Sequence, residues 1–188
     1  MRKLKLQVQT AVNGYIAGSN GEMDWTISDW DDDLKNYVAE ITELVDCIVL
    51  GRKLAQGFIP YWAAHPDQEG ADTFNNTPKV VFTKTLDQSE WDNTVLATGD
   101  LVEEITVLKN QTGKDIIAYG GATFVSALIK HGLIDEFHLF INPTAIGNGL
   151  SIFNELESKQ NLILKKSTTF TCGIVVLCYE MAQKEPSK

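Results

Sequence analysis

The sequence has few of the side chains that bind metals or cross-link extracellular domains. Its 188 residues include three cysteines and three histidines. Cys47, Cys172 and Cys178 form no CxxC pair, and Cys47 and Cys178 lie in apolar runs, which is typical of buried, reduced thiols in a cytoplasmic protein. Because the histidines are scattered along the chain, we predict no metal site.

The sequence also has no long apolar run, no recognisable signal peptide and only two arginines. No apolar run approaches the roughly 20 residues that span a bilayer, and Met1–Leu4 leads straight into an alternating pattern without a signal-peptide core. We therefore predict a cytoplasmic protein. The net charge is −9, and the only arginines are Arg2 and Arg52. Because an acidic surface repels nucleic acids and anionic membranes, neither is an expected partner, and a bound phosphate would need a local cluster of cations.

The apolar pattern alternates between strand-like and helix-like segments, which is typical of an α/β protein with a largely parallel sheet. We expect one domain over residues 1–188. Strands are predicted at Leu4–Val12, Asp46–Leu50, Lys79–Phe82, Asp115–Tyr119 and Glu136–Asn142, with an antiparallel hairpin at Leu162–Phe170 and Gly173–Met181. Helices are predicted at about Trp30–Val45, from Gly51 onward, at Leu101–Gln111 and at Ala122–His131, and the segment from about Pro60 to Pro78 is predicted to be irregular.

The first candidate binding segment is Tyr119–Phe124, where a predicted strand meets a predicted helix. Helix N-termini expose unpaired N–H groups and the positive end of the helix dipole, and both favour phosphate. Gly120 and Gly121 would let a ligand approach the backbone closely. A tight turn that binds nothing explains the same residues equally well.

Two further strand ends carry cations. Gly51, Arg52 and Lys53 follow one apolar strand, and Thr83 and Lys84 follow another. The helix dipole disfavours cations in a first turn, so Arg52 and Lys53 suit a bound anion better than a helix start, although a basic pair taken alone is usually solvated. Because ligands of open α/β sheets bind at the carboxyl ends of strands, three such ends in an acidic protein favour a dinucleotide.

A run of aspartates lies at the start of the first predicted helix, and Asp31 flanks its inward face. A carboxylate there could reach a pocket and orient or protonate a heterocycle, so we predict Asp31 as the catalytic residue. The alternative is that Asp31 only stabilises the helix N-terminus, where acidic residues are common.

The motifs together resemble the dihydrofolate-reductase-like family, close to the reductase domain of the bifunctional riboflavin-biosynthesis deaminase–reductase. The matching segments cover nearly the whole chain: Ala11–Gly18, Val49–Lys53, Val81–Thr85, Tyr119–Gly121, Gly132–Glu136, Ile141–Pro143 and Ile146–Gly149. The resemblance implies a three-layer α/β sandwich with a mixed, mostly parallel eight-stranded sheet. It also implies that NADPH binds across the strand ends.

The resemblance assigns functional roles to individual residues. The implied cofactor-binding residues are Ala11, Ile16, Ala17, Gly51, Arg52, Lys53, Thr83, Lys84, Gly120, Gly121, Ala122, Thr123 and Phe124, and the implied substrate-binding residues are Gln9, Trp25 and Tyr119. Within this set, Ala11, Ile16 and Ala17 would border the nicotinamide, and the cations would face the 2′-phosphate and pyrophosphate. The glycine pair of the family often carries a cis peptide.

The sequence departs from the family pattern at three positions: Leu54 replaces a threonine, Asn13 an aspartate and Gln9 a small apolar residue. We expect an NADPH-dependent reductase that transfers a hydride to a C=N or C=O bond of a pteridine-like or pyrimidine-like heterocycle. The alternatives are a nucleotide-binding module with a reductase fold and no turnover, favoured by Leu54 and Asn13, and a flavin-binding protein. The resemblance also allows a homodimer.

Overall fold

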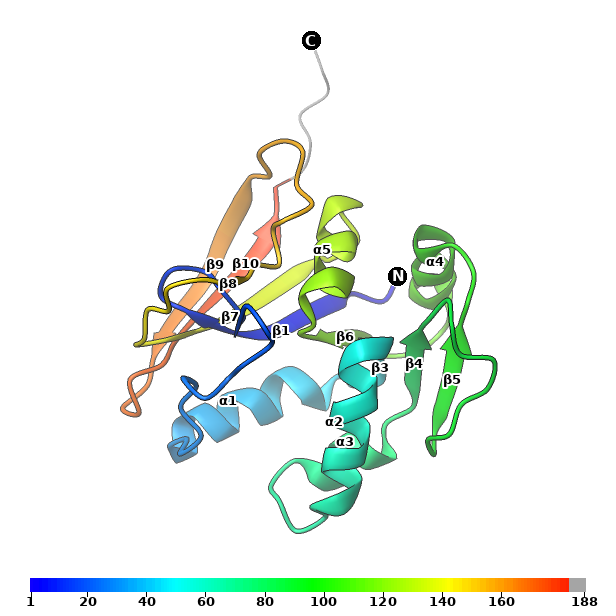
Figure 1. Cartoon of the computed structure of the whole chain (residues 1–188), viewed down its shortest axis with the longest axis horizontal. Coiled ribbons are helices and arrows are strands. Elements are labelled where there is room, and N and C mark those ends of the chain that lie inside the picture. Colours follow the sequence, from blue (N-terminus) through cyan, green and yellow to red (C-terminus); the bar gives the residue numbers. More distant parts are fainter. Residues whose placement is uncertain (183–188) are drawn as a thin grey trace.

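The computed structural model describes residues 1–182, which fold around an eight-stranded sheet (Figure 1). Its strands are β1 (Leu4–Ala11), β3 (Val45–Gly51), β4 (Lys79–Phe82), β5 (Thr94–Ala97), β6 (Asp115–Tyr119), β7 (Glu136–Asn142), β9 (Leu162–Thr169) and β10 (Val175–Met181). Their order across the sheet is β5-β4-β3-β6-β1-β7-β10-β9. The strands from β5 to β7 in this order are parallel, and β10 is antiparallel to both of its neighbours. The predicted sheet with its antiparallel C-terminal hairpin is confirmed.

Helices cover both faces of the sheet and make three layers (Figure 1). The helices of the described residues are α1 (Asp32–Glu43), α2 (Arg52–Ala64), α3 (Ala71–Asn76), α4 (Leu101–Asn110) and α5 (Ala122–Lys130). In the view of Figure 1, α4 and α5 lie above the sheet and α1, α2 and α3 below it. None of these helices is long and apolar enough to cross a membrane.

The central strand β1 alternates as its sequence pattern predicts. Leu4, Leu6 and Val8 enter the large core that also contains residues of α4 and α5. Lys5 belongs to the opposite face, where its ammonium lies 3.4 Å from the carbonyl oxygen of Ile41 at the end of α1. The strand is therefore buried on both faces, and its polar side chains lie between the sheet and the lower helices.

The segment between residues 60 and 78 is largely helical, so the prediction of an irregular excursion is wrong. α2 continues past Pro60 to Ala64, and α3 follows. The apolar residues Ala55, Ile59 and Phe74 pack these two helices onto the sheet. This burial outweighs the cost of a proline inside a helix. The short edge strand β5 was also missed, because four residues carry too little pattern to mark a strand.

A small second sheet fixes the loop after β1. Its strands, β2 (Ala17–Gly18) and β8 (Gly149–Leu150), pair antiparallel. Asn13 strengthens this docking, because its amide donates to the carbonyl oxygen of Ile146 at 2.5 Å and accepts from the N–H of Ile146 at 3.3 Å. An aspartate could not donate in this way, which gives a structural reason for asparagine at this position.

Candidate functional site

Two helices begin at the carboxyl edge of the parallel strands without a capping side chain. α2 starts directly after β3 at Gly51, and α5 starts after β6 at Gly121, and neither has a side-chain cap. In contrast, α1 and α4 are capped by the carboxylates of Asp31 and Asp100. The first N–H groups of α2 and α5 therefore lack side-chain acceptors, and such groups favour an anionic ligand.

Phe124, in the first turn of α5, joins the ends of β3 and β4. A Cβ atom built on Gly51 would lie 2.6 Å from the Cβ of Phe124, so glycine is needed for this close approach. On its other side, the Phe124 ring lies 5.1 Å from that of Phe82, measured between centroids. The segments 51–53, 82–84 and 120–124 thus lie side by side, as an arrangement for one extended ligand requires.

Arg52 and Lys53 project from the first turn of α2. The Arg52 guanidinium donates to the amide oxygen of Gln56 at 3.0 Å, and Lys53 is exposed. Within residues 1–182 neither cation forms an ion pair with a carboxylate. Because both stand at the positive end of the helix dipole, this corner attracts anions despite the acidic net charge.

Thr83 and Lys84 are held by local contacts. The Lys84 ammonium donates to the carbonyl oxygens of Thr98 at 2.7 Å and Gly99 at 2.5 Å, beyond the end of β5. The Thr83 hydroxyl accepts from the backbone N–H groups two and three residues later, each at 3.1 Å. Lys84 therefore ties β4 to β5 and is less available to a ligand than Arg52 and Lys53.

The two glycines after β6 differ in what they require. Gly121 has φ +114°, a conformation that side chains strongly disfavour. A Cβ on Gly120 would meet only Val8 at 3.5 Å and Ile16 at 4.0 Å, which are ordinary contacts. The peptide bond between the two glycines is trans, whereas the resemblance to the family suggested a cis peptide at this position. The fold thus needs glycine at position 121 but tolerates a methyl group at position 120.

The residues predicted to border the nicotinamide are buried beside this turn. Ala11, Ile16 and Ala17 are each less than a tenth exposed. Ile16 donates its N–H to the carbonyl oxygen of Leu150 at 2.9 Å, which fixes its backbone. A Cβ atom on Gly120 would lie 4.0 Å from the Ile16 side chain, so the loop after β1 packs beside the glycine turn.

Gln9 is oriented by a residue that the sequence analysis missed. The amide oxygen of Gln9 accepts from the Asn142 side chain at 2.7 Å, and Asn142 in turn accepts from the backbone N–H of Ile27 at 2.9 Å. Asn142 is fully buried at the end of β7, and a polar residue there was the available signal. The indole N–H of Trp25 donates within its own loop, to the carbonyl oxygen of Glu22 at 3.2 Å.

Tyr119 and Gln7 lie side by side on the face between α1 and α2. The Tyr119 ring packs edge-on against Phe58, with centroids 5.7 Å apart, and burial raises the pKa of its phenol. Gln7 pairs in register with Tyr119 and is 9% exposed. Its amide oxygen has no hydrogen-bond partner among residues 1–182. A buried, unpaired acceptor is costly, so this amide oxygen is a strained point of the β1 face.

Asp31 caps α1, which is the alternative role that the sequence analysis gave it, and its catalytic role stays a prediction. Its oxygens accept from the N–H of Leu34 at 2.8 Å, the hydroxyl of Thr171 at 2.7 Å and the N–H of Cys172 at 2.9 Å. These hydrogen bonds, that of Leu34 first, lower the pKa of Asp31 to about 2. The group therefore carries no proton near neutral pH, and it caps α1 while tying it to the β9–β10 turn.

The strand order, the helices on both faces and the glycine turns at the carboxyl edge define a protein of the dihydrofolate-reductase-like class. A family model described as the RibD C-terminal domain matches residues 2–176. The chain therefore belongs to the RibD C-terminal domain family, as the sequence resemblance predicted.

Known relatives and solved structures agree with this assignment. The uncharacterized protein YyaP of Bacillus subtilis is 34% identical over 187 residues, covering 95% of this chain and 94% of that protein. A putative riboflavin biosynthesis protein from Shewanella sp. PV-4 superposes with a TM-score of 0.75 at 25% identity, covering 97% and 100%. Dihydrofolate reductase from Enterococcus faecalis, solved with NADP(H), has the same fold, with a TM-score of 0.62 at 18% identity and coverage of 95% and 96%.

Proposed function

We propose that this protein is an NADPH-dependent reductase that transfers a hydride to a C=N or C=O bond of a flat heterocycle, pteridine-like or pyrimidine-like. One observation carries the proposal: one edge of the sheet combines two uncapped helix starts, a glycine turn and two cations that have no carboxylate partner in the part of the chain that the structure describes. This arrangement suits a ligand with several phosphates and a flat ring.

The residues at this edge fit NADPH. Gly120 and the N–H groups of Ala122 and Thr123 would hold the pyrophosphate, and Arg52 and Lys53 would contact the 2′-phosphate. Bound NADPH supplies the hydride. The chain aligns the nicotinamide against the wall formed by Ala11, Ile16 and Ala17 and excludes water there.

The substrate side is formed by glutamines instead of cations. Gln9 is held by Asn142, and the unpaired amide oxygen of Gln7 would accept a hydrogen bond from a ring N–H. Of the two arginines, Arg2 pairs with Asp46 at the amino end of β1, and Arg52 belongs to the cofactor corner. We therefore propose a substrate without a phosphate group, because no arginine is left to bind one.

A Gly120→Ala variant tests the cofactor site without threatening the fold. The added methyl group has room in the protein. If the pyrophosphate binds against the backbone of Gly120 as proposed, the methyl group would crowd it. We expect NADPH affinity, measured by nicotinamide fluorescence, to fall at least tenfold while thermal stability stays unchanged. Gly57→Ala is the control, because Gly57 faces open space in α2. If Gly120→Ala bound NADPH as tightly as the wild type, the assignment of the pyrophosphate site to Gly120 would be wrong.

A nucleotide-binding module without turnover is the second candidate. It is favoured by Asp31, whose carboxylate is fully engaged by backbone and hydroxyl groups. NADPH oxidation should be followed with dihydrofolate, pterins, quinones and aldehydes as acceptors. Tight NADPH binding without oxidation by any acceptor would support the module over the reductase.

A further inference from the structure

Strands β7 and β10 bring together a glutamate, a histidine and a cysteine that are not part of the proposed cofactor or substrate site. Glu136 and His138 lie two residues apart on β7 and share a face, and Cys178 pairs in register with His138 across the sheet. One ligand atom from each residue lies within 4.8 Å of the other two. We propose that Glu136, His138 and Cys178 bind one Zn²⁺ ion, which joins β10 to β7.

The burial and chemistry of the three groups suit such an ion. His138 is 3% exposed and Cys178 is 8% exposed, whereas the Glu136 side chain is 17% exposed, so the site is buried on the histidine and cysteine side. Imidazole nitrogen, thiolate sulfur and carboxylate oxygen are the ligands that zinc uses, and three protein ligands leave a fourth position for water. A thiolate and a carboxylate together balance the two positive charges of the ion, and the thiol proton leaves when zinc binds.

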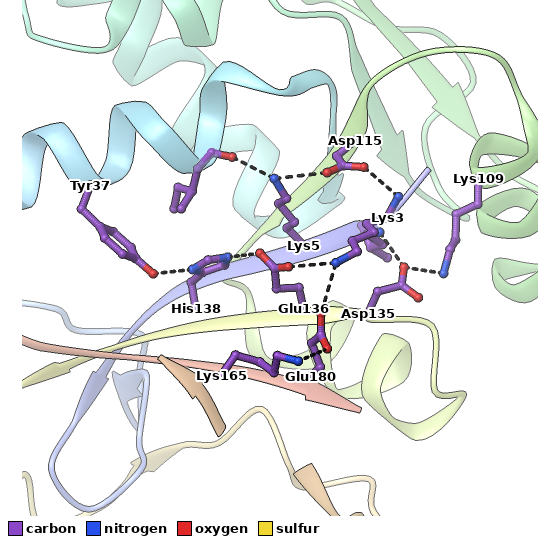
Figure 2. A network of polar contacts seen from close by, with 12 residues as sticks. Lys3, Lys5, Tyr37, Lys109, Asp115, Asp135, Glu136, His138, Lys165 and Glu180 are labelled. Carbon is purple, nitrogen blue, oxygen red and sulfur yellow. Dashed lines mark hydrogen bonds and ion pairs between the residues drawn. The ribbon is translucent and has the colours of Figure 1, made fainter. Parts of the chain in front are cut away.

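His138 is already oriented as a zinc ligand. Its Nδ1 atom lies 2.8 Å from the Tyr37 hydroxyl, and its Nε2 atom lies 2.6 Å from a carboxylate oxygen of Glu136, as Figure 2 shows. Zinc–ligand bonds of about 2.0 to 2.2 Å would place the latter two atoms roughly 3.4 Å apart, so these two atoms must separate by about 1 Å to admit the ion. The ring would then carry its proton on Nδ1 and donate it to Tyr37, which makes Tyr37 a positioning residue.

The nearest competing cation can give way. The Lys3 ammonium lies 3.3 Å from the second oxygen of Glu136 and also 3.2 Å from Glu180, as Figure 2 shows. If Glu136 turns to the ion, Lys3 keeps Glu180 as its partner. Lys166 also approaches this region from β9, with its ammonium 5.4 Å from the centre of the Tyr37 ring. Lys166 pairs in register with Cys178, and within residues 1–182 it forms no ion pair with Glu136.

Metal titration of the full-length protein tests the proposal. Protein stripped with a chelator is titrated with ZnCl2 by calorimetry and with CoCl2 by absorption. We expect one ion per chain and, with Co²⁺, a thiolate-to-metal charge-transfer band together with intense visible bands of a four-coordinate site. A folded protein that takes up no metal at micromolar ZnCl2 would overturn the proposal.

Variants assign the ligands. Cys178→Ser should abolish the charge-transfer band and weaken Zn²⁺ binding at least tenfold, whereas Cys47→Ser, a buried thiol in the core on the opposite face, should leave both unchanged. Glu136→Gln keeps the side-chain shape and should weaken binding at least tenfold. Tyr37→Phe should weaken it roughly 10- to 100-fold but keep the band, as loss of a hydrogen bond to a ligand does.

Near-ultraviolet circular dichroism checks that each variant is folded, and the Gln and Phe variants serve if Cys178→Ser does not fold. A charge-transfer band that survives in Cys178→Ser, or zinc affinity unaffected by Glu136→Gln and Tyr37→Phe, would show that the metal binds elsewhere. NADPH binding has no part in these measurements, so failure of the zinc proposal and failure of the reductase proposal are distinguishable.

Discussion

Gly51 and Phe124 approach so closely that a Cβ atom on Gly51 would lie 2.6 Å from the Cβ of Phe124. This contact presses the first turn of α5 against the end of β3, and it sets the spacing between the two helix starts of the candidate site. The glycine in the Gly-Arg-Lys segment is therefore required by packing before any ligand is considered. Its substitution should disturb the fold and the nucleotide site together.

We predict that Gly51→Ala destabilises the protein by about 1–3 kcal/mol, the usual cost of overpacking a filled site. Because the collision displaces α5, NADPH affinity should fall as well. Urea unfolding and fluorescence titration measure the two effects. Gly57→Ala, inside the helix α2 that follows Gly51 and in open space, should instead be neutral or stabilising by about 0.5–1 kcal/mol. Equal stability of both variants would contradict the close contact.

We predict that the three cations of the candidate site have different roles, in nucleotide binding or in stability. Arg52→Gln and Lys53→Gln should each weaken NADPH binding about tenfold, with little effect on NADH, because they remove charge near the 2′-phosphate. Lys84→Gln should mainly lower thermal stability, since the Lys84 ammonium links β4 to the carbonyl groups beyond β5. Dissociation constants for both nucleotides and melting temperatures provide the comparison. A selective loss of NADPH affinity in Lys84→Gln alone would reverse the assignment.

We predict that Asp31 contributes a pH-dependent part of the stability of the protein and does not take part in the chemical step. Its folded pKa of about 2 lies below the ordinary value of 3.8, so its contribution to stability is present above about pH 4 and is lost as the pH falls toward 2. The stability difference between wild type and Asp31→Asn should therefore be largest near neutral pH and shrink over this range. Turnover at saturating substrate should stay near wild type. A large loss of kcat with normal melting behaviour would restore a catalytic role.

Gln7 offers a test in which stability and function change in opposite directions. Removing an unpaired buried acceptor relieves a desolvation cost, so Gln7→Leu should stabilise the protein by about 1 kcal/mol. If Gln7 accepts a hydrogen bond from the substrate, kcat/KM should fall while NADPH affinity is unchanged. Gln9→Leu is the comparison, since it breaks an existing hydrogen bond with Asn142 and should destabilise the protein. Destabilisation by Gln7→Leu would show that its amide oxygen has a partner in solution.

The sequence was sufficient for the central strands of the sheet and for the edge at which their carboxyl ends meet. The alternation of Leu4, Leu6 and Val8 marks a central strand, and chain order in an α/β protein places the ends of parallel strands at one edge. The local sequence pattern did not predict structure where contacts between residues far apart in the chain determine it. Burial of Ile59 and Ala55 carries α2 past Pro60, and the hydrogen bond from Thr171 to Asp31 joins two residues that lie far apart in the chain.

The sequence analysis also could not predict which residues of distant strands pair with one another. His138 and Cys178 meet because β10 returns antiparallel to β7 in a particular register, and no local pattern encodes that register. Scattered histidines therefore led us to predict no metal site, and the zinc site proposed above departs from that prediction. The same limit hid the link between Gln9 and Asn142, which lie far apart in the chain.

Lys79 should make stability rise in mild alkali. Its side chain is 2% exposed and donates to the carbonyl oxygens of Asn75 and Thr77, at 3.1 and 2.8 Å, and burial lowers its pKa from 10.5 to about 8. Between these values the unfolded chain holds a proton that the folded protein has lost, so folding becomes more favourable as the pH rises. The stability of wild type relative to Lys79→Met should therefore increase by about 1–2 kcal/mol from pH 7 to 9.5, measured by urea unfolding. Other lysines and tyrosines titrate alike in both proteins and cancel in the difference. A difference that stays constant over this range would mean that the buried ammonium keeps its proton, held by the two carbonyl groups.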